Sequence, residues 1–266
     1  MKRTVKQVII ASTIILIILV FVAILFWSEQ VDMTCFDGIQ NQKEENIDCG
    51  GPCEKSCEPL QQKKINVLDA SYVLISGDAY NLIGLISNDN PNYGSGSVEY
   101  KFNVFSDSGN LIKTISSYTY ILSNQIKYVV LPGVKISQNI GRVEMEIIDS
   151  QFELLDAGKE PKLLVSSKDI VMNDDKTKIS GIVQNSSSFD YAKVNVVAVL
   201  KERDTGKILL AGSTVLNTVL AGEMRMFYIE WPRYLGSSDY EWSILAETNV
   251  FDASNYYRKD GGTTQF

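Results

Sequence analysis

The sequence predicts a mainly β protein that begins with one transmembrane α-helix, continues through a small disulfide-rich module and ends in two tandem immunoglobulin-like β-sandwiches. Three observations predict this class: residues 8–27 carry no charge, four cysteines fall within residues 35–57, and much of the remaining chain repeats itself. The expected parts, in order, are a cytoplasmic stub 1–7, a transmembrane helix 8–27, a cysteine-rich juxtamembrane module 28–59, a linker 60–66, a first β-sandwich 67–150, a linker 151–162, a second β-sandwich 163–250 and a flexible C-terminal tail 251–266.

The uncharged run of residues 8–27 predicts a membrane anchor. As a helix it would extend for about 30 Å, which is the thickness of the hydrocarbon core of a bilayer. Three basic residues precede it and the first charged residues after it are acidic, which favours a cytoplasmic N-terminus and extracytoplasmic C-terminal domains. A cleaved signal peptide has a shorter apolar region and a small-residue cleavage site, which residues 28–32 do not provide. We therefore expect a single-pass protein of the cell membrane.

Composition narrows the chemistry of the part beyond the helix. Without the three basic residues of 1–27, the chain's 25 Lys and Arg fall to 22, against 32 Asp and Glu. This acidic balance disfavours nucleic acid as a partner. The chain has no histidine, which excludes Ser-His-Asp and Cys-His catalysis and histidine-ligated zinc. No nucleophile elbow or phosphate-binding loop is present, so we expect no enzyme.

The four cysteines, Cys35, Cys49, Cys53 and Cys57, predict two disulfides. A short segment on the oxidising side of a membrane has too little apolar material for a core and is commonly stapled in this way. A four-cysteine zinc site would require paired C-x2-4-C knuckles, whereas the spacing here is C-x13-C-x3-C-x3-C. Three pairings of the four cysteines are possible, and the sequence leaves them open.

Oxygen donors between the cysteines are candidates for calcium binding. Asp37, Asn41, Glu44 and Asp48 carry carboxylate and amide oxygens of the kind that calcium prefers. One short loop rarely completes the six to eight ligands of a calcium ion, so a disulfide-stapled turn with solvated acids is our favoured interpretation and calcium the alternative. No other cofactor is expected.

The arrangement of these residues resembles a short cysteine-rich module of bacterial and archaeal surface proteins. The resemblance covers residues 35–57, which read C-x-D-G-x-x-N-x-x-E-x-x-x-D-C-G-G-x-C at their start. That module commonly has a glycine after the asparagine, where this chain has Gln42. The resemblance implies a surface location, and the substitution weakens what it implies about ion binding.

An internal repeat predicts two homologous domains. At an offset of 97 residues, Gly84–Asn88 falls on Gly181–Asn185 and Asp107–Gly109 falls on Asp204–Gly206. A further match, of Leu131-Pro-Gly133 with Leu220-Ala-Gly222, has an offset of 89 and predicts that one loop differs by eight residues between the copies.

Each copy is expected to be all-β. Tyr100, Phe102 and Val104 alternate with polar residues, which is the period of a strand with one face in a core. In the second copy, the strand Val194–Leu200 is apolar on both faces. The two Asp-x-Gly sequences predict hairpin turns. Six or seven strands in about 85 residues are typical of a β-sandwich of immunoglobulin type.

Two further patterns in the second copy bear on function. Asn185-Ser-Ser187 matches the acceptor sequence for N-glycosylation, which matters only in a host that glycosylates. Six aromatic residues between Phe227 and Trp242 could form a binding patch. Large aromatics at strand spacing more often fill a core, which is the interpretation we prefer.

The order of motifs in each copy resembles the FxLYD-type domains of bacterial envelope proteins. Residues 168–231 carry the resemblance best, through Gly181–Asn185, Asp204–Gly206 and Leu220–Phe227. The resemblance implies a fold and no ligand. We therefore expect a non-catalytic binding or structural role at the cell envelope, with an unidentified protein or other envelope partner. The alternatives are an accessory subunit of a secretion, pilus or transport assembly and, least favoured, a carboxylate-based extracytoplasmic hydrolase.

Overall fold

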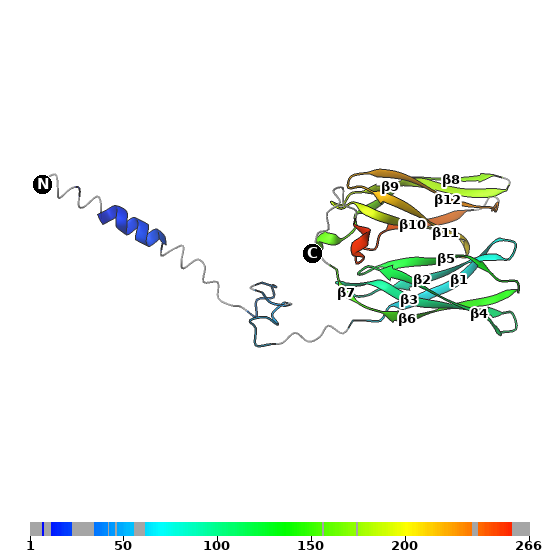
Figure 1. The fold of residues 1–266 in the computed structure, drawn as a ribbon, viewed down its shortest axis with the longest axis horizontal. Helices are drawn as coiled ribbons and strands as arrows, with labels where there is room; N and C mark the ends of the chain where they lie inside the picture. The colour runs from blue at the N-terminus through cyan, green and yellow to red at the C-terminus, as the bar shows by residue number, and fades with distance from the viewer. Residues whose placement is uncertain are drawn as a thin grey trace. The chain divides into compact units, whose positions relative to one another are not determined.

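The computed structural model describes residues 7, 12–22, 35–41, 43–45, 47–55, 62–155, 157–173, 175–235 and 239–256. The chain divides into two compact units, Met1–Gln61 and Gln62–Phe266. The first unit holds a helical stretch and the cysteine-rich module, and the second holds all the described strands (Figure 1).

Part of the predicted transmembrane segment is described. Residues 12–22 are helical and their side chains are exposed. Within the described ranges, no helix is both long and apolar enough to cross a membrane. Residues 8–11 and 23–27 of the predicted span lie outside the described residues. The membrane anchor therefore stays a prediction.

The first half of the second unit contains two antiparallel sheets. Their strand orders are β1-β2-β5 and β4-β3-β6, and the short β7 pairs with β3. The bounds of the strands are β1 Asn66–Ser76, β2 Ala79–Ser87, β3 Tyr93–Ser106, β4 Leu111–Ile121, β5 Ile126–Lys135, β6 Ile140–Ser150 and β7 Glu153–Leu154. Tyr100, Phe102 and Val104 of β3 are buried while the residues between them are half-buried, so the predicted alternation is confirmed.

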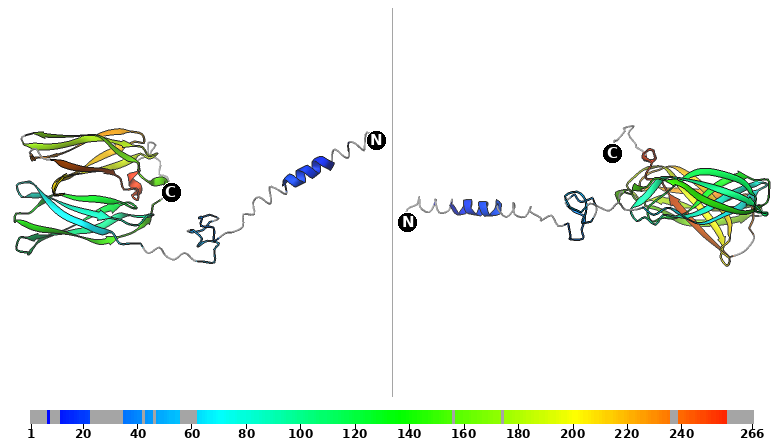
Figure 2. Two further views of the ribbon diagram at one scale, coloured as in Figure 1. Left: turned by 180° about the vertical axis from the view of Figure 1, so that it is seen from behind. Right: turned by 90° about the horizontal axis from the view of Figure 1, so that it is seen from below.

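The second half has the same sheet orders. Its sheets are β12-β9-β8 and β11-β10-β13. The bounds are β8 Leu163–Asn173, β9 Lys176–Asn185, β10 Tyr191–Glu202, β11 Ile208–Val219, β12 Met224–Trp231 and β13 Tyr240–Glu247, with short 3-10 helices η1 Ala157–Lys159 and η2 Ala253–Asn255. The mainly β class is confirmed. Figure 1 shows the four larger sheets lying as successive layers, and Figure 2 shows them from behind and from below.

The predicted eight-residue difference between the copies is wrong. Leu131-Pro-Gly133 lies inside β5, whereas Leu220-Ala-Gly222 forms the turn between β11 and β12. The true counterpart of the second segment is the turn Leu122–Gln125 between β4 and β5. In both turns the first leucine N–H donates to the last side chain: Leu122 N to Gln125 Oε1 at 2.8 Å and Leu220 N to Glu223 Oε2 at 2.7 Å. The match is hidden in the sequence because Asn124 adopts the positive φ that Gly222 adopts in the other copy.

An asparagine at the end of the second strand fixes each of these turns. The side-chain amide of Asn88 donates to the carbonyls of Tyr93 and Leu122, and that of Asn185 donates to the carbonyls of Phe189, Val219 and Leu220. Both asparagines are almost fully buried. The amide therefore donates to backbone carbonyls that lie away from water. In the second half, the Leu220 carbonyl also accepts the Glu223 N–H and the Phe189 carbonyl also accepts the Ser187 hydroxyl.

A core of buried side chains lies within each half. In the first half it draws Leu82 and Ile86 from β2 and Val98 and Phe102 from β3, so both sheets contribute. The core of the second half likewise joins residues of β9 and β12 to residues of β10 and β11, and it also includes Val73 of β1 and Ile83 of β2, from the first half. The core of the second half therefore extends into the sheet β1-β2-β5 of the first half.

Strand β10 shows why the halves are joined. Residues Val196–Leu200 are buried without interruption, although successive side chains of a strand point to opposite faces. One face belongs to the core of the second half, and the other packs toward the sheet β1-β2-β5 of the first half. The sequence of Val194–Leu200, apolar on both faces, is the local signal of this packing.

The segment 251–256 lies inside the predicted flexible tail and is built into the fold. The backbone of Tyr256 forms a bridge with Tyr191, and its ring contacts those of Phe189 and Tyr191 with centroids 5.3 and 5.9 Å apart. Residues 257–266 lie outside the described residues.

Candidate functional site

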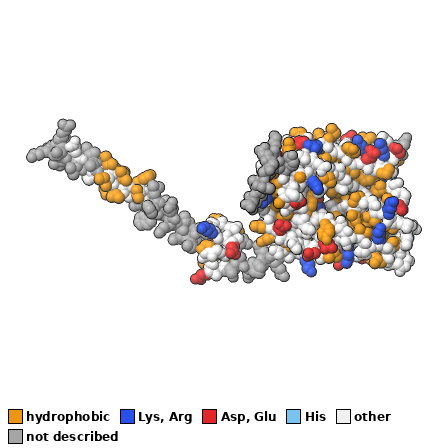
Figure 3. Space-filling model, in the orientation of Figure 1, with side chains coloured by type: hydrophobic (Ala, Val, Ile, Leu, Met, Phe, Trp, Pro, Cys, Tyr) orange, Lys and Arg blue, Asp and Glu red, His pale blue; other side chains and the backbone are white. Residues whose placement is uncertain are grey.

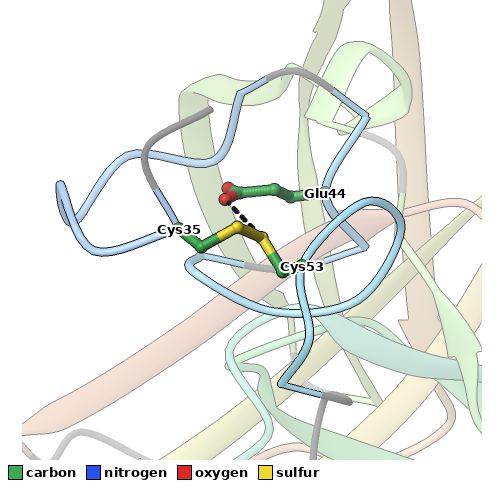
Figure 4. Close-up of side chains that lie close together, drawn as sticks. All are labelled: Cys35, Glu44 and Cys53. Carbon is green, nitrogen blue, oxygen red and sulfur yellow. Dashed lines mark hydrogen bonds between the residues drawn. A yellow bond between two sulfur atoms is a disulfide. The ribbon is translucent and has the colours of Figure 1, made fainter. Parts of the chain in front are cut away.

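The cysteine-rich module contains the disulfide that the sequence predicts. Cys35 and Cys53 are joined, and Cys49 is also disulfide-bonded (Figure 4). Cys57 lies outside the described residues. The pairing of Cys35 with Cys53 could not be chosen from spacing, because all three connectivities place cysteines within reach of one another in so short a segment.

The predicted calcium ligands hold the loop of this module through hydrogen bonds. The carboxylate of Asp48 accepts the backbone N–H groups of Asp37 and Gly38 at 3.0–3.1 Å. That of Asp37 accepts the Ile39 N–H and the Asn41 side-chain amide. These acids thus hold together the described part of the module, in which no helix or strand is found.

Glu44 is the buried member of the predicted set. Its Oε2 accepts the N–H groups of Asn41 and Asp48 at 3.2 and 3.3 Å. Its Oε1 lies 3.2 Å from Sγ of Cys53, a contact drawn dashed in Figure 4. Because this sulfur belongs to a disulfide, it has no proton to donate, and the contact positions the carboxylate against the covalent staple.

The module offers a metal ion little in this arrangement. Among the described residues, the only group of three potential cysteine or carboxylate ligands is Cys35, Glu44 and Cys53, and two of these are consumed by the disulfide. The structure does not gather Asp37 and Asp48 with Glu44 into one such group. Oδ1 of Asn41 is shielded from solvent without a hydrogen-bond partner in the described part of the chain. Calcium binding stays a prediction.

Reduction of the disulfide is expected to open this module selectively. A crosslink over a separation of 18 residues is worth roughly 3 kcal/mol in loop entropy, and without disulfides the described loop would be held mainly by hydrogen bonds of exposed and half-buried groups. Trypsin should cleave after Lys43 at least tenfold faster in dithiothreitol than without it, as measured by peptide mass spectrometry. Cleavage after Lys207, in the β-rich unit, is the internal control. Equal rates at Lys43 with and without reductant would contradict a disulfide-dependent fold.

A second candidate site lies between the two halves of the β-rich unit. Lys127 of β5 and Glu247 of β13 form an ion pair whose side chains are only 2% and 4% exposed. The ammonium group also donates to the Tyr120 carbonyl at 2.9 Å and lies over the Tyr120 ring at 4.0 Å. The Gln125 side-chain amide donates to Glu247 Oε2 at 2.9 Å. Every charge taken from water here has a compensating partner, as buried charges require.

The surroundings perturb two titratable groups of this cluster. Burial lowers the pKa of Lys127, and the Glu247 carboxylate acts in the opposite direction. Burial also raises the pKa of Tyr120 well above its ordinary value, and the negative charge of Glu247 raises it further. The Tyr120 hydroxyl accepts the Asn195 amide of β10 at 3.1 Å. The cluster thus stays neutral overall and ties β4 and β5 to β10 and β13.

Asn81 makes a further polar tie between the halves. Its side-chain amide donates to the Ala211 carbonyl of β11 at 2.7 Å, and its Oδ1 accepts the Gly133 N–H of β5 at 2.9 Å. Neither Asn81 nor Lys127 is among the functional residues predicted from the sequence. Each is an isolated polar residue within an apolar strand sequence. That pattern indicates a buried polar contact only when both faces of the strand are known to be buried.

Alkaline pH is expected to destabilise the β-rich unit. An unfolded tyrosine ionises near pH 10, whereas folded Tyr120 keeps its proton to higher pH, so the folded state binds more protons and stability falls as pH rises above about 10. The lowered pKa of Lys127 acts oppositely, but only up to about pH 10.4, where unfolded lysine loses its proton. Guanidinium unfolding between pH 9 and 11.5 should show the decline, and Tyr120→Phe should make it shallower. An unchanged slope in the variant would contradict this assignment.

The acceptor sequence for glycosylation is buried, whereas the aromatic set is divided between the core and the surface. Asn185 is fully buried with its amide bonded to three carbonyls, so the acceptor sequence is closed to a glycosyltransferase in the folded protein. Of the aromatic residues, Phe227 and Trp231 are buried in the second-half core, whereas Tyr228 and Tyr234 are exposed. The expectation of a core role is therefore confirmed for some members of this set and not for others.

The surface of the β-rich unit carries both signs of charge. Figure 3 shows acidic and basic side chains interspersed over the drawn face, with hydrophobic side chains between them. No family model matches the chain, and a search of curated proteins finds no match.

Proposed function

We propose that this chain is a single-pass membrane protein with a non-catalytic binding or structural role at the cell envelope. In this proposal, residues 8–27 anchor it with the N-terminus in the cytoplasm, and the disulfide-stapled module and β-rich unit lie outside. The two halves of that unit are immunoglobulin-like β-sandwiches similar to FxLYD-type domains. The disulfide between Cys35 and Cys53 supports the outward orientation, because such bonds persist in oxidising compartments.

The observation that carries the structural role is the union of the two halves. Tandem domains within one chain are usually joined by modest, polar interfaces and move relative to one another. Here Val73 and Ile83 of the first half enter the core of the second, and the buried Lys127–Glu247 pair crosses the same boundary. A unit joined in this way is suited to present its surfaces in a fixed geometry.

Topology is the first test of the proposal. An epitope tag is added after Phe266, and intact cells expressing the full chain are treated with protease before and after permeabilisation. We expect the tag to be digested from outside and the protein to stay with membranes in alkaline carbonate. Protection of the tag in intact cells, or release of the protein by carbonate, would overturn the membrane-anchored assignment.

The role is tested separately by the state of the extracted protein. Mild detergent extraction followed by mass measurement distinguishes a lone surface binder, which runs at the mass of a single 29.7 kDa chain plus detergent, from a subunit of a larger envelope assembly. We expect the lone chain. A discrete multiprotein complex of constant composition would favour the accessory-subunit alternative.

A further inference from the structure

A groove runs along the open edge of strand β1. It has a volume of about 570 Å³ and is lined by Asp69–Leu74 of β1, Gly141–Val143 of β6, Gly206–Leu209 at the start of β11, and Arg233. Strands β1, β6 and β11 each lie at the end of their sheet, so three sheet edges meet there. The volume lies within the range of clefts that bind ligands.

The edge of β1 presents backbone groups to this groove. In an antiparallel pair, alternate residues turn their N–H and C=O groups away from the partner strand. The Leu74 carbonyl is accessible from the side away from β2, because it accepts the Arg233 guanidinium at 3.3 Å. By the same alternation, Ala70 and Tyr72 face the groove with their backbone groups. Such an edge is a template for one more strand.

The charged side chains around the groove are mainly basic, in a chain whose net charge is −7. Arg142, Lys207 and Arg233 line it, and Asp69 is the only acidic residue among the described lining residues. Arg142 already forms an exposed ion pair with Glu144. In the described part of the chain, no acidic side chain forms an ion pair with Lys207 or Arg233. The Leu74 carbonyl that accepts the Arg233 guanidinium is neutral, so both side chains keep a positive charge that an anionic ligand can neutralise.

We propose that this groove binds an extended, acidic polypeptide segment of another protein, which adds as a strand to β1. The backbone edge favours a peptide over other anions, because only a peptide supplies alternating N–H and C=O groups at strand spacing. The basic rim favours carboxylate side chains on that peptide. The groove does not depend on the membrane anchor, so a failure of this proposal and a failure of the proposed function can be told apart.

The test measures peptide binding to the full chain in detergent micelles by fluorescence anisotropy. The probe is a fluorescein-labelled octapeptide of alternating glutamate and valine. Its counterpart with lysine in place of glutamate tests charge, and the acidic peptide methylated on alternate backbone nitrogens tests strand addition. We expect the acidic peptide to bind at least tenfold more tightly than either of the other two, with weaker binding at high salt.

Charge reversal locates the binding site. Lys207→Glu with Arg233→Glu should weaken binding of the acidic peptide at least tenfold. Lys162→Glu with Lys168→Glu changes the net charge equally at exposed positions outside the groove and should change affinity less than twofold. Circular dichroism and thermal melting check that both variants fold. On the unchanged protein, hydrogen exchange should slow in residues 69–74 when peptide is added, which tests the site without any variant.

Four comparisons of binding could each overturn the proposal. The contrary outcomes are equal binding of the acidic and lysine peptides, equal binding of the methylated peptide, equal losses in the two double variants, and tighter binding of an eight-nucleotide oligothymidylate than of the acidic peptide. The last would show that the groove selects anionic polymers and not a peptide strand. Absence of any binding to 1 mM peptide would also overturn it.

Discussion

Replacing one partner of the Lys127–Glu247 pair is expected to cost about 3–5 kcal/mol of unfolding free energy. In Lys127→Met the Glu247 carboxylate stays buried without its cation, and in Glu247→Leu the Lys127 ammonium stays buried without its anion. An unpaired buried charge loses its hydration and gains nothing in return. Urea unfolding of the full chain, followed by tryptophan fluorescence, measures the loss.

A double variant distinguishes the interaction within the pair from the effects of burying either side chain alone. Lys127→Met combined with Glu247→Leu removes both charges and should recover most of the stability lost by either single change, because apolar groups of similar size replace a buried ion pair at little cost. The exposed pair Lys101–Glu146, whose side chains are 29% and 58% exposed, is the control and should contribute less than about 1 kcal/mol. Single variants that lose less than 1 kcal/mol, or a double variant that loses the sum of both, would contradict a tightly coupled pair.

Replacement of Asn185 is expected to be the second most damaging change. Asn185→Ala leaves the carbonyls of Phe189, Val219 and Leu220 without the side-chain donor and opens a small cavity. The variant also loses the two bonds that Asn185 Oδ1 accepts from Ser187, whereas the Leu220 and Phe189 carbonyls each keep one other donor. At roughly 0.5–1.5 kcal/mol for each lost bond, a total loss of about 3 kcal/mol is expected. Chemical unfolding monitored by circular dichroism gives the value.

An isosteric substitution of Asn185 tests whether the loss of stability comes from its missing hydrogen-bond donor. Asn185→Asp keeps the shape of the side chain, removes the donor and sets a negative charge among carbonyl oxygens, so it should destabilise at least as much as alanine at pH 7 and less at pH 3. Asn88→Ala should behave similarly, because Asn88 holds the equivalent turn of the first half. Asn217, which is exposed, provides the control and should lose less than about 0.5 kcal/mol on change to alanine. Equal stability of Asn185→Asp and the parent at neutral pH would contradict the donor role.

The strands could be predicted from the sequence because their signals are local. Alternation in β3, the two Asp-x-Gly turns and the matching Gly84–Asn88 and Gly181–Asn185 segments each depend on a few neighbouring residues. The structure gives Gly109 and Gly206 the positive φ that these turns require. The alignment of Leu131–Gly133 with Leu220–Gly222 was wrong because the true counterpart of the second segment, the turn Leu122–Gln125, has Asn124 where the other copy has Gly222.

The junction between the halves could not be predicted, because it depends on which faces meet. Lys127 and Glu247 are 120 residues apart in the numbering, and nothing near either one indicates the other. The apolar residues on both faces of β10 indicate that its second face is covered, but they do not show which strands cover it. In the module, the sequence indicates which side chains carry oxygen atoms, but not what those atoms bind. The carboxylates accept the N–H groups of Asp37, Gly38, Asn41 and Asp48, and these bonds depend on a loop conformation that residue spacing does not determine.

The covered second face of β10 also bears on how this protein can evolve. Duplicated domains on hinged linkers can be gained, lost or shuffled by recombination, because each copy remains soluble by itself. In this chain, deletion of the first half would expose the apolar face formed by Val197 and its neighbours, and such a face promotes aggregation. We therefore expect the two halves to be inherited together, with sequence changes that stay compatible across the interface between them.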